Sequence, residues 1–147
     1  MAINPNLASA HAFTGHAKLF IGRGEETEGH VRHALRLSPL DTFAFGWLAI
    51  IGYSKLHFGQ DEEAAAWLRR SIETNRNFSP AHLNLAAALA HLGRPKEAQA
   101  AVQAGLDLEP SFTIARCRAS LPSDNARFLA QFERVFDGMR KAGVPEE

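Results

Sequence analysis

Seven histidines and a single cysteine are the side chains of this 147-residue chain that are best suited to chemistry. His30 and His33 are three residues apart, and His11 and His16 are five residues apart. Each pair would share part of a helix surface, but a zinc site needs three or four converging ligands. No neighbouring cysteine, aspartate or glutamate completes either pair, so we expect solvated histidines and no bound metal.

Cys117 and the two tryptophans have simpler explanations than catalysis. A cysteine beside a histidine could be a nucleophile, but a lone cysteine in a short amphipathic segment is more typical of a small buried hydrophobe. Trp47 and Trp67 could form a binding hot spot, although their helical spacing favours core packing. The sequence has no phosphate-binding loop, nucleophile elbow or paired-carboxylate signature. We therefore expect no enzyme activity and no cofactor.

The composition narrows the possible partners. The 16 basic and 16 acidic side chains cancel, which argues against nucleic acid and against a polybasic membrane contact. The longest near-apolar run, residues 43–53, is shorter than the about 20 residues that span a bilayer. The first residues lack the basic start and apolar run of a signal peptide. With one cysteine and no disulfide framework, we expect a reducing, cytoplasmic setting.

Glycine and proline recur along the chain with a fixed period. Gly59 and Gly93 are 34 residues apart, as are Pro5 and Pro39. A period of this length is typical of stacked helical hairpins. Within each period a glycine separates two segments whose apolar residues recur at helical spacing. We therefore predict an all-α solenoid of about three hairpins, with helix pairs over residues 7–20 and 25–37, 41–58 and 61–74, and 79–92 and 95–108.

The ends of these helices carry matching signals. A glycine after a helix enters the left-handed region without strain, which fits Gly22, Gly59 and Gly93. Gly22 and Gly59 are 37 residues apart, three more than the regular period. We interpret the extra residues, near 40–45, as an added turn that lengthens the following helix. Asp41 or Thr42 would cap that helix.

The regular period ends at Pro110. A short helix is expected over residues 112–120 and a long one over 124–142, with Ser123 as its N-cap and Gly143 at its end. Four apolar side chains share one face of the long helix: Leu129, Phe132, Phe136 and Met139. Burying them contributes roughly 6–12 kcal/mol as an upper bound. The last helix is therefore expected to be a structural cap over the last hairpin.

Over residues 8–112 these positions resemble the tetratricopeptide repeat (TPR) family. The family's small residue in the first helix corresponds to Gly15, Gly52 and Ala86, and its alanine in the second helix corresponds to Thr27, Ala64 and Ala98. The tryptophan and tyrosine positions of the family hold other residues here, so the repeats are divergent. The resemblance implies repeats over 8–40, 41–78 and 79–112, followed by the short helix and the capping helix over 113–147.

Pro5 occupies the position of the proline that closes a repeat, so we interpret residues 1–7 as the remnant of an earlier repeat. A chance N-terminal proline is the alternative. Residues 36–43, 93–98 and 138–146 also resemble certain bacterial multidomain proteins with a class III adenylate/guanylate cyclase domain, or a DNA-binding regulator domain, upstream of C-terminal TPRs. This likeness implies a regulatory arm of a larger signalling protein, because nothing in the chain resembles the cyclase catalytic core.

In the TPR family the first helices of successive hairpins line a concave groove. Carried over position by position, the resemblance implies a groove lined by Ala12, His16, Leu19, Phe20, Ala49, Tyr53, Leu56, His57, Leu83, Ala87, Ala90 and His91. Such a groove is apolar and aromatic, which suits an amphipathic helix or an extended apolar peptide. Its three histidines could contact the peptide or respond to pH, or they could be ordinary polar lining.

The best-known ligand of the family is an acidic chaperone tail, whose carboxylates are clamped by lysine, asparagine and arginine. The matching positions here hold Ala12, His16, Ile50, Pro80 and Asn84. Only Asn84 has a suitable polar group, so we expect no carboxylate clamp and instead a different protein or peptide partner. Two alternatives stay open: the chain's own C-terminal segment fills the groove, or a second copy binds there in a homo-oligomer.

Overall fold

The computed structural model describes residues 5–147, and this part of the chain has eight α-helices, one short 3₁₀ helix and no β-strand. The elements are α1 (Pro5–Phe20), η1 (Gly24–Glu26), α2 (Thr27–Leu37), α3 (Ala44–His57), α4 (Asp61–Thr74), α5 (Ser79–His91), α6 (Pro95–Leu108), α7 (Ile114–Ala119) and α8 (Ala126–Ala142). The all-α solenoid expected from the sequence is confirmed.

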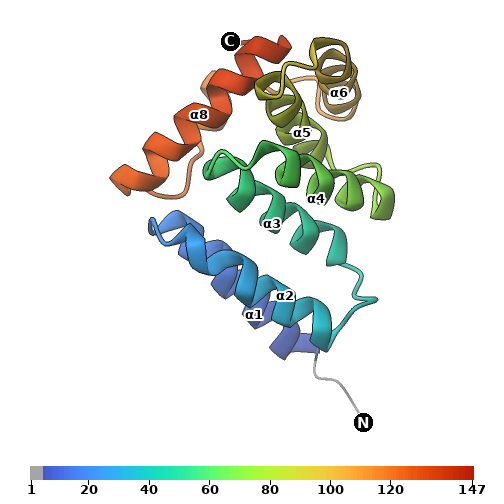
Figure 1. The fold of residues 1–147 in the computed structure, drawn as a ribbon, viewed down its shortest axis with the longest axis vertical. Helices are drawn as coiled ribbons and strands as arrows, with labels where there is room; N and C mark the ends of the chain where they lie inside the picture. The colour runs from blue at the N-terminus through green and yellow to red at the C-terminus, as the bar shows by residue number, and fades with distance from the viewer. Residues whose placement is uncertain (1–4) are drawn as a thin grey trace.

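Three helical hairpins form the body of the molecule. Helix α1 packs against α2, α3 against α4, and α5 against α6, and successive hairpins then stack on one another (Figure 1). The last helix, α8, does not continue this stack. It runs back across the molecule, from the turn of the first hairpin to α5 and α6 (Figure 1).

The same turn closes each hairpin. Gly22, Gly59 and Gly93 have φ angles of +78°, +75° and +74°, in the left-handed region where a glycine carries no steric penalty. The amide after each glycine donates to a carbonyl five residues earlier, as in Arg23 N to Lys18 O at 2.8 Å. This is the bond that ends a helix in a Schellman motif. The recurrence of glycine at these three positions in the sequence therefore reflects three equivalent helix ends.

Small residues allow the two helices of a hairpin to approach closely. A Cβ atom added to Gly52 would lie 2.7 Å from the Leu68 side chain. At a comparable crossing, the Thr27 hydroxyl donates to the Gly15 carbonyl of the partner helix at 2.7 Å. A larger side chain at either glycine would force the helices apart, because protein interiors leave no space for it.

The starts of α3 and α8 differ from the predictions. Helix α3 begins at Ala44, so the three extra residues of the second period lie in the loop before it and the predicted lengthening of this helix is wrong. Asp41 stabilises that loop by accepting from the Phe43 amide at 2.9 Å, and does not cap the helix. Helix α8 is capped by Asn125, whose side chain accepts from the Phe128 amide. Ser123, the predicted cap, has another role described below.

The predicted remnant of an earlier repeat covers residues 1–7. Residues 1–4 lie outside the described part of the chain, and residues 5–7 form the first turn of α1. Proline is well tolerated at the first position of a helix, where its missing N–H costs no hydrogen bond.

The buried side chains form two clusters. The main core joins α3–α8 and includes Leu68, Leu89 and Phe136. The N-terminal core lies between the first two hairpins and includes Val31 and Trp47. Trp47 is therefore a core residue, as its helical spacing predicted. No helix within residues 5–147 combines the length and the apolar character needed to cross a membrane.

Helix α8 belongs to the main core through one face. Phe136 and Met139 are fully buried, as expected, whereas Leu129 and Phe132 are half-buried. Phe128 is also fully buried, although the sequence argument did not single it out. The helix ends at Gly143, which adopts a φ of +101°. The predicted capping helix is thus present, but it contacts all three hairpins and not only the last one.

Candidate functional site

Two arginines on α8 attach this helix to the turns of the first and second hairpins. Arg127 donates to the Gly22 carbonyl at 2.6 Å and to Glu25 at 3.1 Å. Arg134, seven residues later, donates to the Leu56 carbonyl at 3.0 Å and to both oxygens of Asp61 at 2.8 and 2.6 Å. Each guanidinium therefore lies at the C-terminal end of a first helix, where the helix dipole favours positive charge.

At the third hairpin α8 makes a close backbone contact. A Cβ atom added to Gly138 would lie 2.8 Å from the Ala87 carbonyl and 2.8 Å from the His91 ring, so only glycine fits there. The His91 Nε2 atom donates to the Arg134 carbonyl at 2.8 Å. These contacts place α8 across the C-terminal ends of α1, α3 and α5, which is one end of the predicted concave groove.

The segment that leads into α8 closes the molecule against α1. The Ser123 hydroxyl donates to the Phe20 carbonyl at 2.6 Å, and the Asn125 amide donates to the Ile21 carbonyl at 3.1 Å. Both bonds join residues more than 100 positions apart in the chain. The first hairpin is therefore tied to the C-terminal segment, and the concave face is enclosed from that side.

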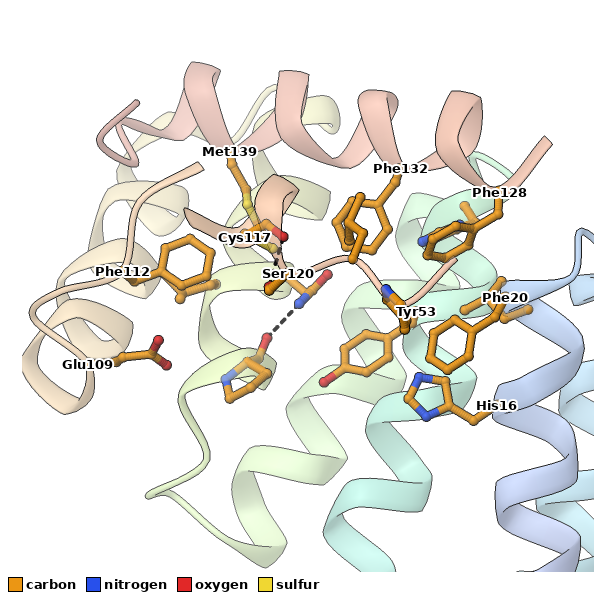
Figure 2. Close-up of a pocket in the computed structure, with 17 residues that line it drawn as sticks. His16, Phe20, Tyr53, Glu109, Phe112, Cys117, Ser120, Phe128, Phe132 and Met139 are labelled. Atoms are coloured by element: carbon orange, nitrogen blue, oxygen red, sulfur yellow. Dashed lines mark hydrogen bonds between the residues drawn. The ribbon is translucent and has the colours of Figure 1, made fainter. Parts of the chain in front are cut away.

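The groove that remains under this cover is a cavity of about 240 Å³. Figure 2 shows side chains from α1, α3, α8 and the α6–α8 segment converging on it. Its lining residues are His16, Leu19, Phe20, Tyr53, His57, Pro80, Leu83, Asn84, Glu109, Phe112, Cys117, Ser120, Leu121, Pro122, Phe128, Phe132 and Met139. Ser120 and Pro122 are exposed, so the cavity opens to solvent beside them.

Stacked and edge-on rings form one wall of the cavity. The Phe128 ring lies 5.7 Å from the His57 ring, 5.5 Å from Phe20 and 5.5 Å from Phe132, measured between centroids. The His16 ring lies 4.3 Å from Phe20. Contacts of this kind favour fixed ring orientations. The wall is therefore a preorganised aromatic surface built from α1, α3 and α8.

The two histidines of the wall are uncharged at neutral pH. Burial lowers the pKa of His16 and of His57 to about 4 in each case. The Nδ1 atom of His57 and the Oε1 atom of Gln131 are both buried without a hydrogen-bond partner. The two side chains do interact, because the Gln131 amide raises the pKa of His57 against the larger effect of burial, but their geometry falls short of a hydrogen bond.

Tyr53 and Cys117 add two further polar atoms to the cavity (Figure 2). Burial raises the pKa of the Tyr53 phenol, so it remains protonated. Burial also raises the pKa of the Cys117 thiol, and Glu109 adds to this effect. Cys117 is half-buried and borders the cavity, whereas the sequence argument predicted a buried core residue. Its high pKa leaves little thiolate, which disfavours a nucleophilic role.

The structure distributes the predicted groove residues between two environments. Six of them line the cavity: His16, Leu19, Phe20, Tyr53, His57 and Leu83. Ala12, Ala49, Leu56 and Ala87 are buried between helices, while Ala90 is partly buried against the main core and His91 lies under α8. The residues missed by sequence reasoning come mostly from 109–139. The apolar face of the last helix is visible in the sequence, but the sequence does not show which surface this helix packs against.

The positions that the sequence resemblance matched to a carboxylate clamp are occupied differently here. Ala12 and Ile50 are buried. The Asn84 side-chain amide donates to the Pro80 carbonyl at 2.8 Å (Figure 2). His16 is neutral, as described above.

The other histidines lie outside the cavity. His11 packs edge-on against His33, with ring centroids 4.3 Å apart. Within residues 5–147 there is no group of three His, Cys, Asp or Glu side chains that could hold a metal ion. Trp67 is half-buried and packs against the N-terminal core, as its spacing predicted, and the guanidinium groups of Arg32 and Arg70 lie 4.9 and 4.6 Å from its ring.

Comparisons with known proteins agree with this architecture. Residues 67–100 match the family model described as "Tetratricopeptide repeat". A comparison with curated proteins found no match. Among solved structures, the Arabidopsis OM64 TPR domain is similar at a TM-score of 0.67 and 16% identity, covering 90% of this chain and 97% of that one.

Two further solved structures are similar to the chain. The first TPR of Spaghetti (RPAP3), bound to the HSP90 peptide SRMEEVD, has a TM-score of 0.67 and 14% identity, covering 94% of this chain and 97% of that one. MamA has a TM-score of 0.66 and 17% identity, covering 94% of this chain and 81% of that one. The fold is therefore that of a TPR solenoid, although the sequences have diverged widely.

Proposed function

We propose that the chain is a non-catalytic protein-interaction module that binds an apolar peptide segment of a partner protein in the cavity of its concave face. The observation that carries this proposal is the cavity itself, which is lined by all three first helices and bordered by solvent-exposed residues. Concave, mostly apolar pockets with a few polar groups are the usual form of binding sites.

The expected peptide differs from an acidic tail. RPAP3, which has the same fold, is described as bound to the peptide SRMEEVD. In this chain, by contrast, the cavity lining contains no lysine or arginine, and its two histidines are neutral because burial lowers their pKa. A carboxylate would lose its hydration there without gaining a cation. We therefore propose that this module does not use a carboxylate clamp.

A peptide-display selection on the purified chain tests this function. Selected peptides are measured by fluorescence anisotropy against the unmodified chain, against Cys117→Phe, which places a phenyl ring in the cavity, and against Leu40→Ala. Leu40 lies in the loop between α2 and α3, is 96% exposed and does not line the cavity, so it serves as the control. We expect Cys117→Phe to weaken binding at least ten-fold and Leu40→Ala to leave it unchanged.

The opposite pattern would refute the proposal. If every selected peptide binds Cys117→Phe as tightly as the unmodified chain, the cavity is not the site. If Leu40→Ala alone loses binding, the interaction surface lies around the loop between α2 and α3 and not at the cavity.

A homo-oligomerisation module is the second candidate. Phe13, Leu40 and Phe43 are 67%, 96% and 63% exposed, so their apolar side chains are available for contact with a second copy of the chain. Light scattering over a hundred-fold range of concentration tests this alternative. A constant monomer mass argues against it, and a dimer that Phe13→Ala or Leu40→Ser dissociates supports it.

We also propose that the module is the regulatory arm of a larger signalling protein of the adenylate cyclase type. This proposal rests on the sequence likeness of residues 36–43, 93–98 and 138–146 alone. Sequencing the transcript upstream of the Met1 codon tests it. A reading frame that continues into a cyclase or DNA-binding regulator domain supports the proposal, and any other upstream frame contradicts it.

A further inference from the structure

We infer that the cavity binds the uncharged aromatic side chain of a partner peptide, a tryptophan or a tyrosine, through its ring and through one hydrogen bond to His57. This inference rests on the proposed function and names the chemistry of the partner. Three properties of the cavity carry it: its size, the imidazole of His57 in its wall and its lack of positive charge.

The size of the cavity suits one aromatic side chain. A dry cavity of about 150 Å³ lined by apolar residues accommodates benzene. At about 240 Å³, this cavity has room for a phenol or an indole with its methylene group. The rings of Phe20, Phe128 and Phe132 lie along one side of it, where they can contact a further ring edge-on or in an offset stack.

The polar atoms of the cavity call for a hydrogen-bonding ligand. His57 is 5% exposed, and none of the described residues forms a hydrogen bond with its Nδ1 atom. A neutral imidazole has one N–H and one bare nitrogen, so a relaxed contact of the Nδ1 N–H with the Gln131 carbonyl oxygen would leave Nε2 as the bare acceptor. An indole N–H or a phenol O–H in the cavity would donate to that nitrogen.

The charges around the cavity favour an uncharged side chain over a charged one. Both lining histidines are neutral at pH 7. Glu109 is the only acidic residue in the lining, and one of its oxygens accepts from the Ser79 hydroxyl at 2.6 Å. An anionic side chain would find no cation in the lining. A cationic side chain would have only Glu109 as a counter-charge, and the rest of the lining is mostly aromatic and aliphatic. An uncharged ring avoids both costs.

The test uses the full chain labelled with ¹⁵N and the N-acetyl amides of tryptophan, tyrosine, phenylalanine and leucine as probes. Dissociation constants follow from amide shift changes at pH 7. We expect the tryptophan and tyrosine amides to bind at least ten-fold more tightly than the leucine amide, and more tightly than the phenylalanine amide. The shifts should concentrate on residues that line the cavity, such as Tyr53, Leu83 and Cys117.

Three variants separate the hydrogen bond from the shape of the site. His57→Phe keeps a ring in the wall but removes its nitrogens, so the preference for tryptophan over phenylalanine should fall at least five-fold. Cys117→Phe should abolish binding of all four probes. Because that variant could disturb α7, Ser120→Phe at the exposed rim provides a second way to block the cavity. Leu40→Ala, in the exposed loop between α2 and α3, is the control without effect.

The inference is overturned if the leucine amide binds as tightly as the aromatic amides, or if His57→Phe leaves the preference for tryptophan intact. Display peptides that occupy the cavity without an aromatic residue would leave the proposed function standing and overturn this inference alone. Aromatic amides that bind although no peptide does would refute the proposed function, and with it the assignment to a partner side chain.

Discussion

Gly138 provides the sharpest test of how α8 is seated on the concave face. In Gly138→Ala the new Cβ atom would lie 2.8 Å from the Ala87 carbonyl and from the His91 ring. The carbonyl belongs to the backbone of α5 and cannot rotate away, so α8 must shift. Overpacking of this kind costs about 1–3 kcal/mol, while alanine gains up to about 1 kcal/mol over glycine inside a helix. The expected net loss of stability is about 0–2 kcal/mol.

Gly29→Ala is the matched control. Gly29 also lies in a helix, but an added Cβ atom there meets nothing within 4 Å. This substitution should stabilise the chain by up to about 1 kcal/mol. The difference between the two variants cancels the propensity gain and isolates the contact with α5, which we place at about 1–3 kcal/mol.

Urea unfolding followed by circular dichroism measures both variants. For a chain of this size each 1 kcal/mol shifts Tm by about 2–4 °C, so differential scanning calorimetry provides a second readout. Equal stabilisation by Gly138→Ala and Gly29→Ala would refute the reasoning, because it would mean that α8 does not lie against Ala87.

Three further predictions concern an ion pair of α8, a hydrogen bond within the first hairpin, and the two buried histidines of the cavity wall. Arg134→Met removes the bidentate pair with Asp61, whose side chain is only 10% exposed, and should destabilise the chain by about 1–3 kcal/mol in urea unfolding. Arg140→Met, which removes only solvent-exposed ion pairs, should leave the stability nearly unchanged. Thr27→Val leaves the Gly15 carbonyl without its donor and should cost about 1 kcal/mol by the same assay, and a neutral result would contradict the buried bond. The pKa of His16 and of His57 is about 4 in the folded chain against the usual 6.5 of an unfolded histidine, so the unfolded chain binds more protons between these values. Stability should therefore fall by up to about 5 kcal/mol as pH drops from 6.5 to 4, and a flat unfolding free energy in this range would contradict the burial of these rings.

The hairpins could be predicted from the sequence because their signals are local. Gly22, Gly59 and Gly93 are needed for a left-handed residue at the end of each first helix, and this need appears directly as a repeated residue type. The start of α3 could not be read in the same way. An insertion of three residues fits either a longer helix or a longer loop, and the loop is held by Asp41 and Ser38 through a local hydrogen bond.

The position of α8 and of the segment leading into it over the groove depends on long-range contacts, which no local sequence pattern reveals. The apolar face of α8 was visible in the spacing of Phe132, Phe136 and Met139, but spacing does not say which surface receives that face. Its position is set by bonds such as Ser123 to Phe20, which join residues 103 positions apart. For the same reason the neutral state of His57 could not be predicted, because it arises from burial under Phe128 and Phe132.

The reactivity of Cys117 tests the central claim most directly, because it is the only cysteine in the chain and it borders the cavity. Its modification by a thiol reagent is followed at pH 7.5 with and without a saturating peptide from the display selection. If the peptide occupies the cavity, the rate should fall at least ten-fold, while the rate in urea, where the cavity is absent, should not respond to the peptide. An unchanged rate on the folded chain with the peptide bound would contradict the claim that partners enter the cavity beneath α8.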